Sequence, residues 1–409
     1  MSESLIVINA GSSSLKFNMY QVPATETVEV NDLSYLYGGQ VSGIGTDIAH
    51  FQVKGALGQI LEDRRTSFEE TKDLQAAQEL LANWITARME KPAIAVGHRI
   101  VHGGTEMKGS TVIDDSVLQY LDDLAPLAPL HQHNNLAPVR VIREHWPQIL
   151  QVACVDTAFH CQQDSLYNYY ALPRSYYEQG VRRYGFHGLS YQYISDYLAQ
   201  HLPDLYHGRV IVAHLGSGSS ACMIQEGKSI ISTMGFTALD GLPMSTRPGR
   251  LDAGVVLWWM QQQKKSADEI QDLLYNQSGM KGLSGISGDM RTLLASDDPQ
   301  AKLAVDYYCF RTAESLAGLC VATQGVDGIV FTAGVGEHSP EIRARICEHL
   351  AWLGVQLDPE LNTQSAQKIS TDDSAVSVWV IPTNEELVIA REALRHYCAS
   401  KTQQDAQTA

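Results

Sequence analysis

The sequence predicts an α/β protein built from two similar domains, and three observations support this prediction. Short apolar runs rich in β-branched residues are bounded by glycine or polar residues, which is typical of strands buried on both faces. Segments with helical periodicity lie between some of these runs, as in α/β folds. A glycine- and serine-rich segment near the N-terminus also recurs about half a chain later.

The strands that we expect lie at residues 5–8, 93–96, 152–155, 210–213 and 328–332. Apolar residues at helical spacing predict helices over 74–90 and 384–398. A further helix should begin at Pro340, with Ser339 as its cap, and Glu386 should form a capping box with Thr383. The polar ends, 1–3 and 401–409, should fray.

Composition excludes several classes of protein. The 409 residues have a net charge of −16, which disfavours nucleic acid and anionic membranes as partners. The chain is 44% apolar and 19% charged, as in ordinary globular proteins, and no apolar run is long enough to span a membrane. Seven scattered cysteines without a CxxC motif, and the lack of a signal peptide, predict a cytoplasmic protein without structural zinc.

The internal repeat pairs IVINAGSSSLKFNMY (6–20) with IVAHLGSGSSACMIQ (211–225) without gaps. Gly11 falls on Gly216 and Ser14 on Ser219, and each segment reads as strand, turn, strand. Chance similarity of two Gly/Ser hairpins is one explanation. The other is a duplicated domain, whose two turns offer backbone N–H groups to phosphate oxygens.

A third glycine-rich segment follows the strand expected at 328–332 and precedes the helix expected at Pro340. A strand, a turn with Gly334 and Gly336, and a helix can place a nucleotide at a helix N-terminus. The segment is neither a complete dinucleotide fingerprint nor a P-loop. Such a turn is structural in many proteins, so nucleotide binding depends on all three segments together.

Single charged residues beside glycines are candidate anion or metal sites. Lys16, Arg99, Arg247, Arg250 and Arg291 follow or flank turns, where a guanidinium or ammonium group can bind phosphate or carboxylate. Structural ion pairs are the alternative for each arginine.

Carboxylates and histidines stand at similar places. Asp156 ends an expected strand, and Glu385 is a candidate Mg²⁺ ligand. His131 and His187 follow apolar or aromatic residues, which is equally typical of structural histidines.

Taken together, ten motifs resemble the acetate kinase family, which has the actin-like ATPase (ribonuclease H-like) fold. They are VINAGSSSLKF, GHRIVHGG, APLAPLH, DTAFH, RRYGFHGLSY, HLGSGSS, MSTRPGRLD, SGDMR, FTAGVGEHSPEIR and PTNEELVIAR. They occur in the family order and span residues 5 to 395. The resemblance implies two duplicated actin-like domains with a central cleft, the first over 1–160 with 387–409 and the second over 161–386.

The resemblance also implies reversible, Mg²⁺- or Mn²⁺-dependent phosphoryl transfer from ATP to acetate, giving acetyl phosphate and ADP. The implied metal ligands are Asn9 and Glu385, and the implied catalytic residues are Asp156, His187, Arg247, Arg99 and His131. The implied nucleotide site comprises Lys16, Ser12, Ser14, His214, Leu215, Gly216, Ser217, Gly218, Asp289, Met290, Arg291, Gly334, Val335, Gly336, Glu337 and His338. A homodimer is implied as well.

An acetate nucleophile is already ionised at pH 7, so Asp156 is expected to orient other groups rather than accept a proton. Removing Arg99 or Arg247 should lower turnover and leave the fold intact. Acyl-chain choice should depend on Val101, Leu130, Phe186 and Ala238. Because Ala238 stands where the family has proline, propionate is expected as a second substrate.

Departures from the family pattern leave alternatives open. Gln132 and His133 replace Asn-Pro, Ser217 and His338 replace asparagines, and Arg250 replaces an acidic residue. A propionate kinase and a phosphate- or pyrophosphate-linked acetate kinase are therefore alternatives. A sugar kinase would use Asp156 as a base, and a non-catalytic ATP-binding protein would show assembly or peptide binding instead of turnover.

Overall fold

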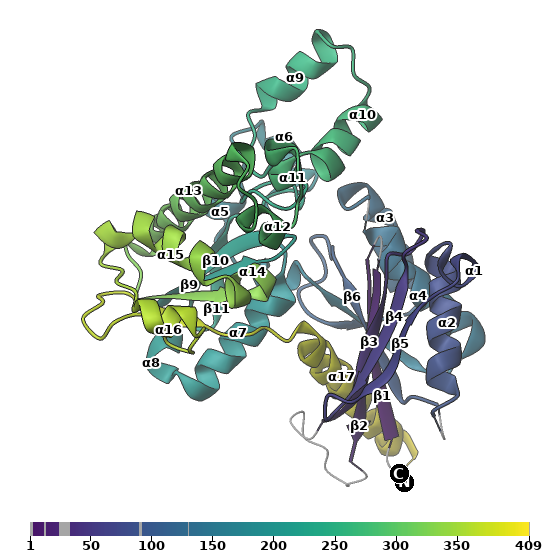
Figure 1. The fold of residues 1–409 in the computed structure, drawn as a ribbon. Helices are drawn as coiled ribbons and strands as arrows, with labels where there is room; N and C mark the ends of the chain where they lie inside the picture. Colours follow the sequence, from purple (N-terminus) through teal and green to yellow (C-terminus); the bar gives the residue numbers. More distant parts are fainter. Residues whose placement is uncertain (1–2, 12–13, 24–32, 90–91, 130, 409) are drawn as a thin grey trace. The chain divides into compact units, whose positions relative to one another are not determined.

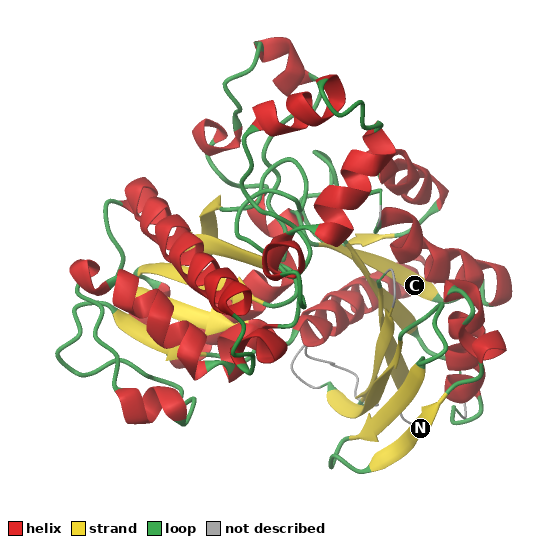
Figure 2. Cartoon of the chain, turned by 45° about the horizontal axis from the view of Figure 1, so that its top comes forward, coloured by secondary structure: helices red, strands yellow, loops and turns green. Residues whose placement is uncertain are grey.

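A computed structural model describes residues 3–11, 14–23, 33–89, 92–129 and 131–408, with backbone only over 403–408. The chain divides into two compact units, unit 1 (Met1–Ala158 and Asn384–Ala409) and unit 2 (Phe159–Thr383). Figure 1 shows the ribbon, and Figure 2 shows helices and strands by colour. No helix among the described residues is long and apolar enough to cross a membrane.

The elements of unit 1 are β1 (Glu3–Ala10), β2 (Ser14–Val22), β3 (Ser34–Ser42), β4 (His50–Gly55), β5 (Ile60–Arg65), α1 (Phe68–Thr71), α2 (Leu74–Thr86), β6 (Ala95–Ile100), β7 (Thr111–Val112), α3 (Asp115–Asp123), η1 (Ala125–Leu127), α4 (Gln132–His145), β8 (Leu150–Val155) and α17 (Glu385–Thr408). The short 3₁₀ segment η2 (Ala158–His160) follows β8 at the division between the units.

The elements of unit 2 are α5 (Ser165–Asn168), α6 (Arg174–Glu178), α7 (Gly188–His201), α8 (Pro203–Tyr206), β9 (Arg209–Leu215), β10 (Ser219–Gln225), β11 (Lys228–Ser232), α9 (Ala253–Gln261), α10 (Ala267–Asp272), η3 (Leu273–Gln277), α11 (Gly279–Ser284), α12 (Met290–Leu294), α13 (Pro299–Thr323), β12 (Gly328–Thr332), α14 (Ala333–His338), α15 (Pro340–His349), η4 (Ala351–Leu353), α16 (Pro359–Thr363) and β13 (Ser377–Val380).

The two sheets share one topology, which confirms the predicted α/β class and the duplication. In unit 1 the strand order is β5-β4-β3-β2-β1-β6-β8-β7, and in unit 2 it is β11-β10-β9-β12-β13. In both sheets a meander of three antiparallel strands is followed by two parallel ones. The additional strands β4, β5 and β7 of unit 1 extend this shared core at its edges.

Helices cover both faces of each sheet, because successive apolar residues along a strand point to opposite faces and each face packs against helices. In β9, Ile211 and Ala213 pack with α13 and α15, whereas Val210 and Val212 pack with α7 on the other face. In β1, Ile6 and Ile8 pack with α2 and α4. Helix α17 covers the opposite face of the unit 1 sheet (Figures 1 and 2). Strands buried on both faces explain the near-continuous apolar runs in the sequence.

Gly97 allows α17 to approach the sheet closely. A Cβ atom at Gly97 in β6 would lie 2.5 Å from Cγ2 of Ile389 and 3.1 Å from its carbonyl oxygen. Any side chain at this position would therefore displace the helix whose first residue is Glu385.

Several predicted elements differ from the observed ones. The strand expected at 93–96 is observed at Ala95–Ile100, and the helix expected to end at 398 continues to Thr408. The segment expected as a turn around Gly334 forms the short helix α14. Helix α15 begins at Pro340 as predicted, but the Ser339 side chain makes no capping hydrogen bond.

The expected capping box of Thr383 and Glu386 is wrong. The Asn384 side chain accepts a hydrogen bond from the Leu387 N–H group (3.0 Å), so Asn384 caps α17. Thr383 instead donates its N–H to Glu337 and accepts a hydrogen bond from Ser190. Asparagine is an equally good cap one residue closer to the helix, and it releases Thr383 for these contacts.

The two repeated segments align without gaps in the sequence, but their turns differ in length by one residue, so the strands that follow the turns pair differently. Ala10 pairs with Leu15 across four intervening residues, whereas Leu215 pairs with Ser219 across three. As a result, Lys16 faces Asn9 in unit 1, and Ser220 faces His214 at the equivalent place in unit 2.

Candidate active site

In unit 1, charged and amide side chains meet where parallel strands end. Arg99 in β6 donates to the carboxylate of Asp156, which follows β8, through Nη2 (2.6 Å) and Nε (3.2 Å). Arg99 Nη1 also lies 3.4 Å from Oδ1 of Asn9 in β1, and its Nε lies 3.6 Å from a carboxylate oxygen of Glu385. One guanidinium therefore connects three strands and the first residue of α17.

Burial governs the electrostatics of this cluster. The side chain of Asp156 is 1% exposed, and those of Glu385 and Arg99 are 14% and 19% exposed. Burial, and the nearby charges of Asp156 and Glu386, raise the pKa of Glu385 to about 7, although Arg99 and Lys16 oppose this shift. Burial lowers the pKa of Arg99, but Asp156 and Glu385 outweigh it, so the net shift is upward and the guanidinium stays charged.

The expectation that loss of Arg99 leaves the fold intact changes with this geometry. Asp156 is almost wholly buried and is held by two hydrogen bonds from Arg99. Removing one partner of a buried ion pair costs about 3–5 kcal/mol, because it leaves an uncompensated charge. An alanine at position 99 would therefore destabilise unit 1.

The predicted metal ligands fit a magnesium ion that also binds phosphate. Asn9 and Glu385 present oxygen atoms, which Mg²⁺ prefers, and both oxygens lie near the same guanidinium. A nearby cation would favour the ionised form of Glu385, which burial disfavours. Within the described part of the chain, no three histidine, cysteine or acidic residues form a metal-binding group. Substrate oxygens and water would therefore complete the coordination.

Helix α4 contributes a supporting residue that the sequence reasoning missed. Asn135 is buried, accepts a hydrogen bond from the Val101 N–H group (2.9 Å) and donates to the Ala10 carbonyl (2.6 Å). It thus ties the end of β6 to the end of β1. His131, the predicted catalytic residue, stands one turn earlier, just before α4. An asparagine one helical turn after a candidate catalytic histidine is the signal that could have identified Asn135.

Gln132, one of the departures from the family pattern, is fully buried. Its amide donates to the carbonyls of His102 (3.1 Å) and Leu121 (3.0 Å). This position therefore connects α4 to the segment after β6 and to α3.

The first glycine-rich turn lies at the end of β1. The Gly11 N–H group donates to the Ser14 carbonyl (2.8 Å), and Lys16 extends as an exposed side chain from β2. Ser12, predicted in the nucleotide site, lies outside the described residues. Lys16 remains close enough to Glu385 to lower its pKa.

In unit 2, two histidines stack where β9 ends. The rings of His187 and His214 lie 4.2 Å apart between centroids, at an interplanar angle of 20°. Ser220 bonds Nδ1 of His187 (2.8 Å), and Ser190 bonds Nδ1 of His214 (2.8 Å). Ser190 and Ser220 lie within the motifs RRYGFHGLSY and HLGSGSS, but the sequence reasoning gave neither serine a role.

His187 has a left-handed backbone conformation, with φ of 57°, immediately before α7. This conformation is unfavourable for residues other than glycine and costs about 1 kcal/mol or more. Its ring nitrogen is bonded to Ser220, which in turn bonds the hydroxyl of Tyr191. These bonds hold the imidazole in one orientation.

Arg247 lies beside His187 and the second glycine-rich turn. A Cβ atom at Gly218 would lie 2.7 Å from Nη2 of Arg247 and 3.3 Å from Nε2 of His187. Arg247 Nη1 donates to the carbonyl of Ala238 (2.7 Å). Glycine at 218 therefore leaves room for two donor side chains at a turn with open backbone, an arrangement suited to phosphate oxygens.

The carboxylate of Glu337 fixes the backbone at the start of the third glycine-rich segment by hydrogen bonds. Its carboxylate accepts hydrogen bonds from the N–H groups of Ala333 (2.7 Å) and Thr383 (3.2 Å). Ala333 has a left-handed backbone conformation, with φ of 64°, so this carboxylate stabilises a strained residue. A Cβ atom at Gly334 would meet no atom within 4 Å. Gly334 is thus exposed in unit 2.

The other predicted nucleotide residues also lie in unit 2. Leu215 is fully buried and Met290 is 6% exposed, so their side chains belong to the core. Asp289 caps α12 and accepts hydrogen bonds from the exposed side chain of Arg291. The Ser217 carbonyl accepts the N–H of Ser245 (3.1 Å). Val335 packs partly against the core, Gly336 is buried, and the side chain of His338 is 78% exposed.

The residues predicted to choose the acyl chain fall in both units. Val101 is buried in unit 1, and Phe186 is buried in unit 2, where its carbonyl bonds Nε2 of His160. Ala238 is half-buried and orients Arg247 through its carbonyl. Leu130 lies outside the described residues.

The chain is similar to known proteins over nearly its whole length. The Acetokinase family matches residues 4–391. An acetate kinase of Nitrobacter hamburgensis is 49% identical over 392 residues, covering 96% of both chains. An acetate kinase of Rhizobium meliloti is 48% identical, covering 96% of this chain and 98% of that one.

Two solved structures share the fold over nearly their whole length. A propionate kinase from Francisella tularensis has a TM-score of 0.87 at 32% identity, covering 96% of this chain and 99% of that one. The acetate kinase of Porphyromonas gingivalis has a TM-score of 0.82 at 31% identity, with the same coverage. The chain therefore belongs to the acetokinase family of kinases, which has the actin-like ATPase fold.

Proposed function

We propose that this protein transfers the γ-phosphoryl group of ATP reversibly to acetate, giving acetyl phosphate and ADP. The observation that carries the proposal is the Arg99 guanidinium, which Asp156 fixes within reach of Asn9 and Glu385. A carboxylate oxygen attacks the γ-phosphorus, and the bond to the β–γ bridging oxygen breaks. No proton needs to be removed from acetate, because it is ionised at pH 7.

In this proposal the residues of unit 1 bind the carboxylate. Arg99 offers paired N–H donors that match carboxylate geometry. Asp156 orients Arg99 through two hydrogen bonds. His131 lies near the transferring group. When Mg²⁺ or Mn²⁺ is bound by Asn9 and Glu385, it neutralises charge on the phosphate oxygens.

The residues of unit 2 bind the nucleotide and stabilise the transition state. The phosphoryl group carries charge on its equatorial oxygens during transfer, and fixed donors are the main source of catalysis. Arg247 and His187 supply these donors beside Gly218. The turn 216–218, the segment 289–291 and helix α14 bind the rest of ATP, with the open space at Gly334 accommodating the adenosine.

We propose acetate as the preferred acceptor and propionate as a second one. One methylene changes the free energy by which an enzyme discriminates between two substrates by only about 1–3 kcal/mol. A site that binds acetate is therefore expected to reject propionate only weakly. The similarity to a propionate kinase from Francisella tularensis supports propionate as an acceptor. A phosphate- or pyrophosphate-linked reaction is the remaining alternative, because Ser217 and His338 depart from the family pattern.

We further propose a cytoplasmic homodimer. Helix α9 has no buried residue, and its Leu257, Trp258 and Met260 are each about half exposed. Exposed apolar patches of this kind mark interaction surfaces. A second copy of the chain would cover them.

The proposal is tested by trapping acyl phosphate with hydroxylamine. Purified protein and Mg²⁺ are given ATP or pyrophosphate, each with acetate, propionate or butyrate. We expect hydroxamate from ATP with acetate and less with propionate. Hydroxamate with pyrophosphate but not with ATP would replace the proposed donor, and no hydroxamate from any pair would refute the formation of an acyl phosphate.

A further inference from the structure

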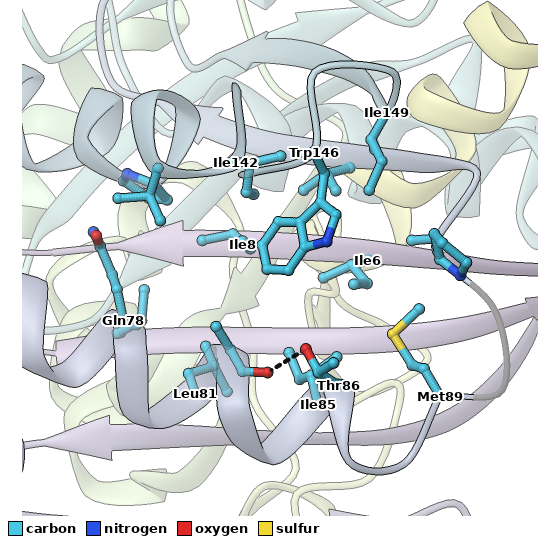
Figure 3. Close-up of a pocket in the computed structure, with 17 residues that line it drawn as sticks. Ile6, Ile8, Gln78, Leu81, Ile85, Thr86, Met89, Ile142, Trp146 and Ile149 are labelled. Atoms are coloured by element: carbon cyan, nitrogen blue, oxygen red, sulfur yellow. Dashed lines mark hydrogen bonds between the residues drawn. The ribbon is translucent and has the colours of Figure 1, made fainter. Parts of the chain in front are cut away.

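Buried polar groups in this protein differ in how firmly hydrogen bonds fix them. In unit 1, an apolar cavity of about 230 Å³ has Ile6, Ile8 and Trp146 among its lining residues (Figure 3). Gln78, which also lines it, has a buried side-chain nitrogen with no hydrogen-bond partner among the described residues. In unit 2, by contrast, the buried hydroxyl of Ser190 has two partners, so the position of its proton can be worked out.

A chain of hydrogen bonds through Ser190 connects one of the two stacked histidines to the third glycine-rich segment. Ser190 of α7 is fully buried, and its hydroxyl oxygen lies 2.8 Å from Nδ1 of His214 and 2.9 Å from the hydroxyl oxygen of Thr383. The N–H group of Thr383 donates to the Glu337 carboxylate (3.2 Å), which also accepts the N–H group of Ala333 (2.7 Å). The chain therefore runs from the end of β9 to the start of α14.

The direction of these bonds fixes a proton on His214. Ser190 is the donor in its bond to Thr383, so its single hydroxyl proton is used there. The Ser190 oxygen must then accept its other hydrogen bond from Nδ1 of His214, and Nδ1 carries the proton. A neutral imidazole has one N–H group, so Nε2 of His214 has a lone pair when the ring is neutral.

Nε2 of His214 lies beside the turn that we propose for the nucleotide phosphates. A Cβ atom at Gly216 would lie 3.9 Å from Nε2 of His214, and one at Gly218 would lie 3.3 Å from Nε2 of His187. Phosphate oxygens that have lost their protons accept hydrogen bonds and do not donate them. The lone pair of the neutral ring would repel such an oxygen, whereas a protonated Nε2 would donate a charge-assisted hydrogen bond to it.

Three charged or titratable groups surround His214. The ring of His187 stacks on it at 4.2 Å between centroids, and Arg247 lies on the far side of His187, beside the turn. The carboxylate of Glu337 is connected to it through Thr383. Two positive rings at this separation, next to a guanidinium, would repel each other strongly. A bound phosphate supplies the negative charge that compensates for one positive ring.

We propose that Ser190 and Thr383 position His214 so that it binds a nucleotide phosphate only as an imidazolium, and that nucleotide binding therefore takes up one proton. The proton comes from the solvent, forms the Nε2–H bond of His214 and returns to the solvent when the phosphate leaves. Ser190 and Thr383 are positioning residues, which act through His214. This inference rests on the proposed function, to which it adds the protonation state of the nucleotide site.

The test is titration calorimetry of the full-length protein with ATP and Mg²⁺ at pH 8, without acetate. An unperturbed imidazole is almost wholly neutral at this pH, and the phosphate groups of ATP hold no proton that they could release. Titrations in Tris, HEPES and tricine, which differ in ionisation enthalpy, give the number of protons taken up from the buffer. We expect about one proton for each ATP bound.

Thr383→Val removes the acceptor of the Ser190 proton and keeps the backbone N–H group at this position. The Ser190 hydroxyl can then donate to Nδ1 of His214, and the neutral ring carries its proton on Nε2, where it can bind phosphate. ATP should therefore bind to this variant with little proton uptake. Thr363→Val is the matched control, because Thr363 is exposed and its hydroxyl donates to the Pro359 carbonyl (2.8 Å); its proton uptake should equal that of the wild type.

Nitrogen-15 nuclear magnetic resonance of the nucleotide-free protein gives an independent readout, because the two imidazole tautomers differ in the chemical shifts of Nδ1 and Nε2. The His214 signals, identified by their absence in His214→Asn, should show the Nδ1–H tautomer in the wild type and the Nε2–H tautomer in Thr383→Val.

ATP binding to the wild type without proton uptake, equal uptake by Thr383→Val, or an Nε2–H tautomer in the wild type would each overturn the proposal and leave the proposed function standing. Failure of ATP to bind at all would refute the proposed nucleotide site itself, and this inference with it.

Discussion

At the residue scale, the most constrained positions are those where one side chain serves several backbone segments. Arg99, Glu337 and Asn135 each connect two or more strand or helix ends. Their motifs predicted a role for Arg99 and Glu337. The sequence reasoning gave Asn135 no role, although it stands one helical turn after His131, because its role depends on two backbone groups that are distant along the chain.

Arg247→Ala should lower kcat by about 10²–10³-fold with little loss of stability. The guanidinium makes a hydrogen bond to the Ala238 carbonyl, and its loss removes a donor for the transferring phosphoryl group. Steady-state kinetics with acetate and ATP, together with urea unfolding, would test this. Unchanged turnover would remove Arg247 from the proposed site.

Gly218→Ala should lower kcat by about 10- to 100-fold. Its methyl group would lie 2.7 Å from Arg247 Nη2, so the guanidinium must move, and small displacements of catalytic groups are costly. Gly318→Ala is the matched control, because Gly318 is exposed on α13 and a Cβ atom there meets nothing within 4 Å. Equal kcat values for the two variants would contradict the inference that a methyl group at position 218 displaces a catalytic guanidinium.

At the element scale, the sequence predicted which segments are strands better than where helices end. The strands at 152–155, 210–213 and 328–332 lie within observed strands because runs of β-branched residues are buried on both faces. Helix α17 is longer than predicted, since its polar last turns carry no apolar periodicity. The short helix α14 was missed because glycines at 334 and 336 predict a turn.

Gly97→Ala should destabilise unit 1 by about 1–3 kcal/mol and lower activity, because the new methyl group would overlap Ile389 and displace α17 with Glu385. Combining it with Ile389→Ala removes the closer of the two contacts. The double variant should therefore be more stable than the sum of the two single effects, as measured by urea unfolding. If the loss of stability in the double variant equals the sum of the two single losses, the methyl group at position 97 does not contact Ile389.

At the scale of the whole molecule, the repeated Gly/Ser hairpin predicted the duplication, and the shared strand order confirms it. The sequence could not show that the two turns differ by one residue, since a gapless alignment conceals a change of register. Nor could it show the cavity at Gln78, which depends on how α2 and α4 pack on one sheet.

Stability should fall on mild acidification. Burial lowers the pKa values of His98, His102 and His160 to about 4, whereas histidines of the unfolded chain take up protons near pH 6.5. The free energy of unfolding is therefore undiminished above about pH 6.5 and decreases as the pH falls toward 4, by up to about 3 kcal/mol per histidine. Urea unfolding of the wild type and of His98→Gln is measured between pH 7.5 and 4.5. The free energy of unfolding should decrease less steeply with falling pH in the variant. An equal decrease in both proteins would show that protonation of His98 does not contribute.

Trp258→Glu should convert the proposed dimer to monomers. It places a charge on the exposed apolar surface of α9, whereas Trp352→Glu places one at η4, where the tryptophan is 73% exposed. Light scattering after size-exclusion chromatography should give a dimeric mass for the wild type and the control only. A monomeric wild type, or a dimeric Trp258→Glu variant, would contradict the proposed surface.

The most direct test of the central claim is ³¹P nuclear magnetic resonance of the wild-type protein with ATP, Mg²⁺ and acetate. The proposed reaction predicts that acetyl phosphate and ADP appear in equal amounts, only when acetate is present. Release of inorganic phosphate with ADP, without acetyl phosphate, would show that water rather than acetate accepts the phosphoryl group, and would contradict the account of Arg99 as the carboxylate ligand.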